Sequence, residues 1–279
     1  MKFLYIAFTK CTLPEQARIG DCMKHLETGG ELQWDKDFLL LSFPEARPSL
    51  STAIYGGGYR NIRYALNQKL TGFFETEADL PGGSPREFLR RSLLTHGCRL
   101  EESSALLTSA RMEWHRHIIK RDGDLIVEAI VTGASERTAV RAGDAALYRE
   151  QDGHFFPCGT INILLLTNAR LEDYLMARAF ITVTEGKTAA FQDVGIASVS
   201  TGRPATGTAT DGITLISSPS DPAYTDAGTF SKLGELLAAA AHDGVLECLS
   251  AYVTPWNRSD TFVTPQAVDI QKLKEKNNP

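Results

Sequence analysis

Short hydrophobic runs separated by turn-forming residues dominate the first part of the chain, a pattern typical of strands. Residues 31–43 hold two such runs around Asp35-Lys36-Asp37, and residues 114–131 hold two around Arg121-Asp122-Gly123-Asp124. Each arrangement predicts a β-hairpin. Residues 160–167 form a continuous hydrophobic run, which is typical of a strand buried on both faces.

Helical patterns prevail in the last third of the chain. Residues 171–194 are apolar around most of a helical circumference, so we expect a buried helix there, with Asn168 as its N-cap. A second helix is expected to begin at Ser231 and to be interrupted at His242-Asp243-Gly244.

Two shorter helices are predicted within the strand-rich part, over residues 61–70 and 86–96. Together these patterns predict an α+β fold in which mixed, largely antiparallel sheets pack against two main C-terminal helical segments. The sequence contains no internal repeat and no low-complexity tract. We therefore expect a single domain over residues 1–255 and a polar C-terminal tail over residues 256–279.

Composition and charge limit the classes of partner. The 279 residues are 43% hydrophobic and 23% charged, and a formal net charge of −5 gives no sign of a basic nucleic-acid-binding face. The N-terminal apolar stretch is too short for a secretory signal, and the run at 161–166 is too short to span a bilayer. We therefore expect a cytoplasmic protein with no nucleic-acid or membrane partner. The five cysteines are scattered, which predicts reduced thiols.

The most unusual polar stretch is RPATGTATD at residues 203–211. In an extended conformation Thr206, Thr208 and Thr210 would face one way, and the glycine between them would let a polar ligand approach closely. An edge strand leading into residues 213–217 explains the same composition equally well. Local sequence alone does not separate the two interpretations.

Two further segments carry charge in hydrophobic surroundings. Glu185 and Lys187 are two residues apart in a predicted buried helix, so they face different ways and each needs a partner elsewhere. Lys232 and Glu235 follow Ser231 at a helix start, where an anion or a polar ligand group is favoured. On local grounds, structural ion pairs and routine helix capping are the simpler explanations.

Familiar catalytic signatures are missing from the sequence. It contains no G-x-S-x-G, no H-E-x-x-H, no P-loop and no G-x-G-x-x-G. His115 and His117 would share one face of a strand, but no third ligand is suggested nearby. We therefore expect no metal site.

Six short segments are spread in order along the chain: residues 50–57, 132–144, 159–163 (GTINI), 184–193, 205–211 (ATGTATD) and 232–236 (KLGEL). In this order they resemble the motifs of the adenosylcobinamide amidohydrolase family. The resemblance implies an enzyme that hydrolyses adenosylcobinamide to adenosylcobyric acid and aminopropanol in cobalamin salvage. The corrinoid would be the substrate, no cofactor would be needed, and a homo-oligomer is compatible with it. A non-catalytic corrinoid-binding or sensing protein of the same fold is the alternative.

The resemblance, together with the needs of amide hydrolysis, implies roles for individual residues. Asp211 is the best candidate for a general base, and Lys187 for holding the oxyanion or protonating the amine. Glu185 and Glu235 are candidates for positioning water or aminopropanol. The other predicted substrate contacts are Thr206, Gly207, Thr208, Thr210, Asn162, Gly57, Lys232 and Phe230. A threonine nucleophile would need an activating base.

The three charged segments are expected to converge on one pocket, because each carries polar groups beside a glycine. The chain also departs from the family pattern. Phe230 stands where His is expected, and Gly186 and Ala209 exchange glycine and alanine.

Overall fold

The computed structural model describes residues 22–71, 77–135, 138–145, 160–220 and 222–253. The predicted tail over residues 256–279 and the N-terminal apolar stretch lie outside these residues. Within them, no helix is both long enough and apolar enough to cross a membrane.

The chain forms eleven strands and three α-helices in the described part. The strands are β1 (Cys22–His25), β2 (Glu31–Trp34), β3 (Phe38–Ser51), β4 (Gly58–Lys69), β5 (Ser103–Thr108), β6 (Arg116–Asp122), β7 (Leu125–Gly133), β8 (Ala139–Val140), β9 (Ile161–Thr167), β10 (Gly207–Thr208) and β11 (Gly212–Ile216). The helices are α1 (Pro85–Thr95), α2 (Asp173–Val194) and α3 (Lys232–Val253), with short 3-10 turns at Glu77–Asp79, Leu100–Glu102 and Met112–Trp114.

Nine strands belong to one sheet, which confirms the predicted mixed, largely antiparallel α+β fold. Its order is β1-β2-β3-β11-β9-β7-β6, and β4 pairs with both β3 and β5. The pairs β4/β5 and β9/β11 are parallel, while the other strand pairs are antiparallel. Strands β8 and β10 form a separate two-stranded sheet.

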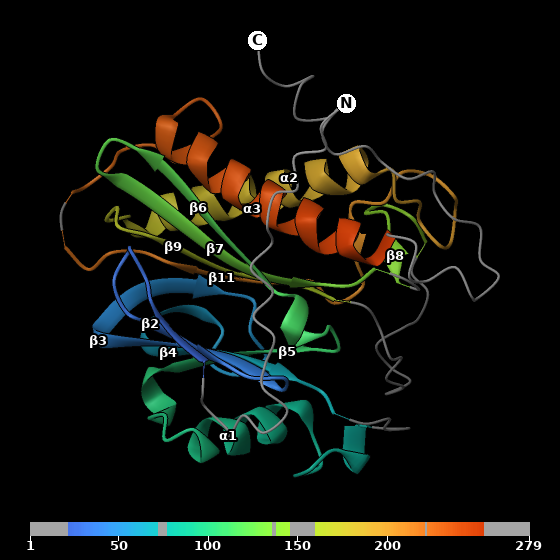
Figure 1. Cartoon of the computed structure of the whole chain (residues 1–279), viewed down its shortest axis with the longest axis horizontal. Helices are drawn as coiled ribbons and strands as arrows, with labels where there is room; N and C mark the ends of the chain where they lie inside the picture. The colour runs from blue at the N-terminus through green and yellow to red at the C-terminus, as the bar shows by residue number, and fades with distance from the viewer. Residues whose placement is uncertain (1–21, 72–76, 136–137, 146–159, 221, 254–279) are drawn as a thin grey trace, which may run out of the picture.

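The large sheet folds over itself into two layers, because β3 is shared between them. Its first half pairs with β2 and its last residues pair with β11, and its register with β4 shifts between Ser42 and Arg47. Helices α2 and α3 cover the layer made by β6, β7, β9 and β11, and α1 lies beneath the layer that contains β4 and β5 (Figure 1).

Three hydrophobic clusters fill the spaces between these four layers. Side chains such as Ile163 and Leu237 pack between the helices and the layer of β6, β7, β9 and β11, here called the upper strands. Leu164 and Ile62 belong to the cluster between the two strand layers, and Leu66 and Leu89 join β4 to α1. The alternation of Ile163 and Leu164 explains why β9 is buried on both faces, as predicted.

Both predicted hairpins and the helices over residues 86–96 and 171–194 are confirmed. The helix predicted over residues 61–70 is wrong, since this segment is β4. Its backbone pairs with strands on both edges, and Ile62 and Leu66 are fully buried. These contacts outweigh local helix propensity.

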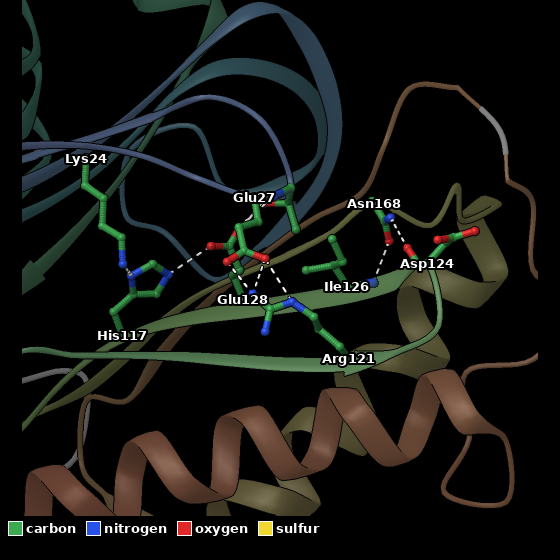
Figure 2. Close-up of polar contacts among 9 residues, drawn as sticks. Lys24, Glu27, His117, Arg121, Asp124, Ile126, Glu128 and Asn168 are labelled. Atoms are coloured by element: carbon green, nitrogen blue, oxygen red, sulfur yellow. Dashed lines mark hydrogen bonds and ion pairs between the residues drawn. The ribbon is translucent and has the colours of Figure 1, made fainter. Parts of the chain in front are cut away.

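Asn168 is not the N-cap of α2, which is Glu172. The Asn168 side chain instead binds the backbone beside the turn of the β6–β7 hairpin. Its Oδ1 accepts a hydrogen bond from the Ile126 backbone N–H at 2.9 Å, and its Nδ2 donates to the Asp124 carbonyl at 2.7 Å (Figure 2). A short amide side chain suits either role, so the sequence alone does not separate them.

Helix α3 is not interrupted at His242-Asp243-Gly244. Contacts with other elements of the fold hold these residues in the helix. Gly244 lies against β7, where a Cβ atom would come within 2.5 Å of the Val131 side chain. His242 bonds Asp243 through Nδ1 at 2.9 Å and Asp193 of α2 through Nε2 at 2.8 Å. The histidine therefore joins α3 to α2.

We expect His242 to make stability depend on pH. Its hydrogen bonds to Asp243 and Asp193 raise the pKa of His242 above its ordinary value despite partial burial. Protonated His242 therefore stabilises the fold, and this contribution is complete below about pH 6.5, the pKa of an unfolded histidine. The contribution is lost as pH rises through the pKa of His242 in the folded state. The free energy of unfolding from thermal melts should therefore be higher for wild type than for His242→Gln by up to about 1 kcal/mol at acidic pH. The difference should be smaller at alkaline pH. A difference that is constant with pH would contradict this account.

Candidate active site

The Asp211 carboxylate, immediately before β11, is held by four donors. Oδ1 accepts from the Ile161 backbone N–H at 3.1 Å and from the Thr208 hydroxyl. Oδ2 accepts from the Thr208 backbone N–H at 3.0 Å and from the Lys187 ammonium. Because a carboxylate offers about four acceptor positions, these bonds fix its orientation.

Lys187 and Asp211 form a nearly buried ion pair. Their side chains are 10% and 12% exposed, respectively. Helix α2 supplies Lys187 from an otherwise hydrophobic face, and the carboxylate offsets the cost of removing its charge from water. Gly207 passes beside both groups, and a Cβ atom there would overlap Asp211 Oδ2 and Lys187 Nζ. The glycine of the ATGTATD segment therefore leaves space for the pair.

The three threonine hydroxyls of this segment do not share one direction. Only Gly207–Thr208 is extended, and Thr208 binds Asp211. Thr206 Oγ1 accepts a hydrogen bond from the Ala142 backbone N–H at 2.9 Å. The Thr210 hydroxyl pairs with that of Thr160 at the start of β9. The expectation of a common row is corrected, because the chain leaves the extended conformation after Thr208.

A second carboxylate anchors the chain that leads into this segment. The Asp144 side chain is 3% exposed and accepts bonds from Thr201 Oγ1 at 2.6 Å, Ser198 Oγ at 3.0 Å and the Arg203 guanidinium at 2.7 Å. The Thr201 hydroxyl is the largest of the causes that hold the pKa of Asp144 below its ordinary value. These bonds hold the loop over residues 198–203, which leads along the chain to Thr208 in β10.

Asn162, a predicted substrate contact, is buried between the two strand layers with 1% exposure. Its Nδ2 donates to Asn67 Oδ1 at 2.8 Å and to the Leu107 carbonyl at 3.0 Å, and Asn67 in turn binds Thr132. Asn162 Oδ1 has no hydrogen-bond partner among the residues that the structure describes. In this structure the side chain joins the layers behind the carboxylate site and does not reach its surface.

The remaining acidic and basic candidates have other surroundings. Glu185 is exposed on α2. Lys232 Nζ and Glu235 Oε2 bond each other at 2.6 Å, both largely exposed at the start of α3. Phe230 is fully exposed, at 104% of its reference area.

Two of the three charged segments meet, because Lys187 binds Asp211, whereas Lys232 and Glu235 bind each other at the start of α3. The pKa of Lys232 is raised, mainly by Glu235 and in smaller part by the charge of Asp122 at the end of β6, so Lys232 lies toward the turn between β6 and β7. Asp211 binds Ile161, which pairs with Gly133 at the opposite end of β7. The strand separates the two groups, so the Lys232–Glu235 pair lies away from the carboxylate site.

Gly57 lies in the loop between β3 and β4, where a Cβ atom would overlap the Ala53 carbonyl. A glycine therefore fits this position because the backbone passes close to the Ala53 carbonyl. The same loop begins beside the carboxylate site, because Thr52 binds Ile213 through two hydrogen bonds of 3.0 Å.

Sequence reasoning missed two contributors to the site. Asp144 lies within a segment that resembles the family, which was the available signal. Ile161 contributes its backbone N–H, a group that nearly every residue carries, so its side chain gave no signal.

A separate polar cluster surrounds the fully buried Glu128 of β7 (Figure 2). Its carboxylate accepts from the Thr28 N–H at 2.8 Å, the Thr28 hydroxyl at 2.5 Å and His117 Nε2 at 3.0 Å, while Lys24 Nζ lies 2.9 Å from His117 Nδ1. Burial alone would raise the pKa of Glu128, but its bonds to His117 and Thr28 lower the pKa to about 2. The cluster fastens the β1–β2 hairpin to the upper strands.

No group of three or more metal-ligating side chains occurs among the residues that the structure describes. His117 bonds Glu128 and Lys24 in the cluster described above. His115 Nδ1 lies 2.8 Å from the Met112 carbonyl.

Comparison with known proteins covers most of the chain. Residues 21–255 match the family described as adenosylcobinamide amidohydrolase. An uncharacterized protein of Methanocaldococcus jannaschii is 33% identical over 228 residues, which cover 76% of this chain and 85% of that protein. An adenosylcobinamide amidohydrolase of Methanosarcina mazei is 30% identical over 147 residues, 53% of this chain and 61% of that protein.

Two solved structures resemble the chain only weakly. A Pyrococcus horikoshii protein has a TM-score of 0.41 at 10% identity, covering 78% of each chain. The L-aminopeptidase D-Ala-esterase/amidase of Ochrobactrum anthropi has a TM-score of 0.37 at 11% identity, covering 88% of this chain and 85% of that one.

Proposed function

The chain belongs to the adenosylcobinamide amidohydrolase family, and from that premise we propose that it hydrolyses the amide joining aminopropanol to a corrin side chain. The products would be adenosylcobyric acid and aminopropanol, in cobalamin salvage. The observation that carries this proposal is the Lys187–Asp211 pair, nearly buried yet placed in two of the segments that resemble the family.

Amide hydrolysis adds water to the carbonyl carbon, breaks the carbon–nitrogen bond and delivers a proton to the leaving amine. The Lys187 ammonium is suited to stabilise the negative charge that develops on the carbonyl oxygen, because it lies in a largely dry environment. It is also a proton donor within the site. Lys187 is therefore our candidate for the group that contacts the reacting amide.

Asp211 has a different part in this proposal. All four of its acceptor positions are occupied, so action as a general base would require a donor to leave first. The occupied state favours a positioning role, in which Asp211 holds Lys187 and Thr208 in place.

The test is incubation with adenosylcobinamide, followed by mass detection of adenosylcobyric acid and free aminopropanol. Release of both products from wild type, and its loss in Lys187→Met, would support the proposal. Binding without release would favour the alternative of a corrinoid-binding or sensing protein. Neither binding nor release with adenosylated corrinoids would contradict both.

Phe230→His is expected to leave turnover within about twofold of wild type, as for most exposed substitutions. Phe230 is fully exposed near the start of α3, and α3 begins at the opposite end of the upper strands from Asp211. The measurement is steady-state turnover of adenosylcobinamide. A gain of about a hundredfold or more would instead mean that the native chain lacks a catalytic group at this position.

A further inference from the structure

Two exposed aliphatic side chains lie on segments that connect directly to the carboxylate site. Ile54, in the loop after β3, is 45% exposed, and Val199, in the loop after α2, is 53% exposed. Large exposed hydrophobic residues are few in the described part of the chain, and most of the others lie on the outer surfaces of α1, α2 and the β1–β2 hairpin.

Strand pairing places the residues just before Ile54 beside β11. Ser51 pairs with Thr214 in β11, and Thr52 continues the pairing through its two bonds to Ile213. After Thr52 the chain leaves β11, and Tyr55 pairs with Ala105 of β5. Ile54 therefore lies just beyond the end of β11 that follows Asp211, between the segments that pair with β11 and β5.

Val199 reaches the site from another direction. Its backbone N–H donates to the Ala139 carbonyl at 2.9 Å, and Ala139 pairs with Thr208. Thr208 supplies two of the donors that hold Asp211. The Asp144 carboxylate fastens the loop that carries Val199, so this side chain has a defined place beside the site.

We propose that Ile54 and Val199 form the apolar surface on which the corrin ring rests while one amide side chain enters the site. This inference rests on the proposed function. The Lys187 and Asp211 side chains are only 10% and 12% exposed, so a wide macrocycle has to remain outside them. A macrocycle that spans the site needs apolar contact on more than one segment, and Ile54 and Val199 supply two.

A polar group borders this surface at the Ile54 side. The exposed Arg86 donates to the Ile54 carbonyl at 3.3 Å, and its guanidinium lies 5.3 Å from the centre of the Tyr55 ring. An arginine has five N–H donors, which suit the carbonyl oxygens of the amide groups around a corrin ring.

The experiment compares Ile54→Ser, Val199→Ser and the control Ile181→Ser. Ile181 is 61% exposed on α2, six residues before Lys187, and among the described residues no strand pairing or loop hydrogen bond joins it to Asp211. Calorimetric affinity for adenosylcobyric acid, which keeps the corrin ring, is measured beside kcat and KM for adenosylcobinamide. We expect each site variant to weaken affinity and raise KM by about tenfold, with kcat retained, and the control to match wild type.

The outcomes separate this inference from the proposed function. Wild-type binding that the site variants weaken and the control does not would support the surface, even if no turnover is seen. Turnover with unchanged affinity and KM in both site variants would overturn the surface while the proposed function stands. An equal loss in Ile181→Ser, or no wild-type binding of adenosylcobyric acid, would also overturn it.

Discussion

Asp211→Asn is expected to lower kcat for adenosylcobinamide by about 10²–10⁴-fold, because Lys187, the group proposed to stabilise charge and donate the proton, loses the residue that positions it. The substitution keeps the shape of the side chain but removes the charge that holds the Lys187 ammonium. It also places an N–H donor among groups that already donate. KM should change less than kcat, because Asp211 is enclosed by its own chain.

Asp124→Asn is the matched control, since Asp124 is exposed in the β6–β7 turn. Circular dichroism and thermal melts establish that each variant is folded. If Asp211 and Lys187 act as one unit, Asp211→Asn combined with Lys187→Met should be no slower than the slower single variant. Losses that multiply would show that the two residues act independently, and near-wild-type turnover of Asp211→Asn would refute the proposed site.

Gly207→Ala is expected to reduce turnover by about a hundredfold or more, although a methyl group is added and no polar group is removed. The new Cβ atom would overlap Asp211 Oδ2 and Lys187 Nζ, so the pair has to separate. Separating a buried ion pair typically costs about 3–5 kcal/mol, so the melting temperature should also fall. Turnover measured well below the melting temperature distinguishes the local effect from unfolding.

Gly244→Ala provides the control for this substitution. Its Cβ atom would also meet a neighbour, but that neighbour is the apolar Val131 side chain, away from the ion pair. We expect Gly244→Ala to lose stability through overpacking while the folded fraction keeps its turnover. Equal losses of turnover in both variants would mean that overpacking alone explains the effect of Gly207→Ala.

The local sequence pattern correctly predicted those elements whose conformation depends mainly on their own residues. Residues 171–194 are long and apolar around their circumference, and α2 follows. The prediction failed for residues 61–70, because β4 owes its conformation to two partner strands, one of them about forty residues further along the chain. Such pairing leaves no mark in a local window.

The same division applies to the candidate site. Sequence singled out Lys187 because a charge in hydrophobic surroundings requires a partner, and it singled out Asp211 through the resemblance, but it did not show that the two pair with each other. It placed Asn162 among substrate contacts, although the side chain points between the layers toward Asn67. It also grouped Lys232 and Glu235 with Asp211, and the strand geometry separates them. The direction in which a side chain leaves its strand, and the distance between two groups along the strands, became clear only from the fold.

The hydrogen bond from the Ile161 backbone to Asp211 Oδ1 has a consequence for observing the site without substrate. Ile161 is fully buried, and its amide hydrogen points at the carboxylate that orders Lys187 and Thr208. Exchange of that single hydrogen with deuterium requires this bond to open. Its exchange rate therefore measures how often the resting site comes apart, on a timescale that turnover does not sample.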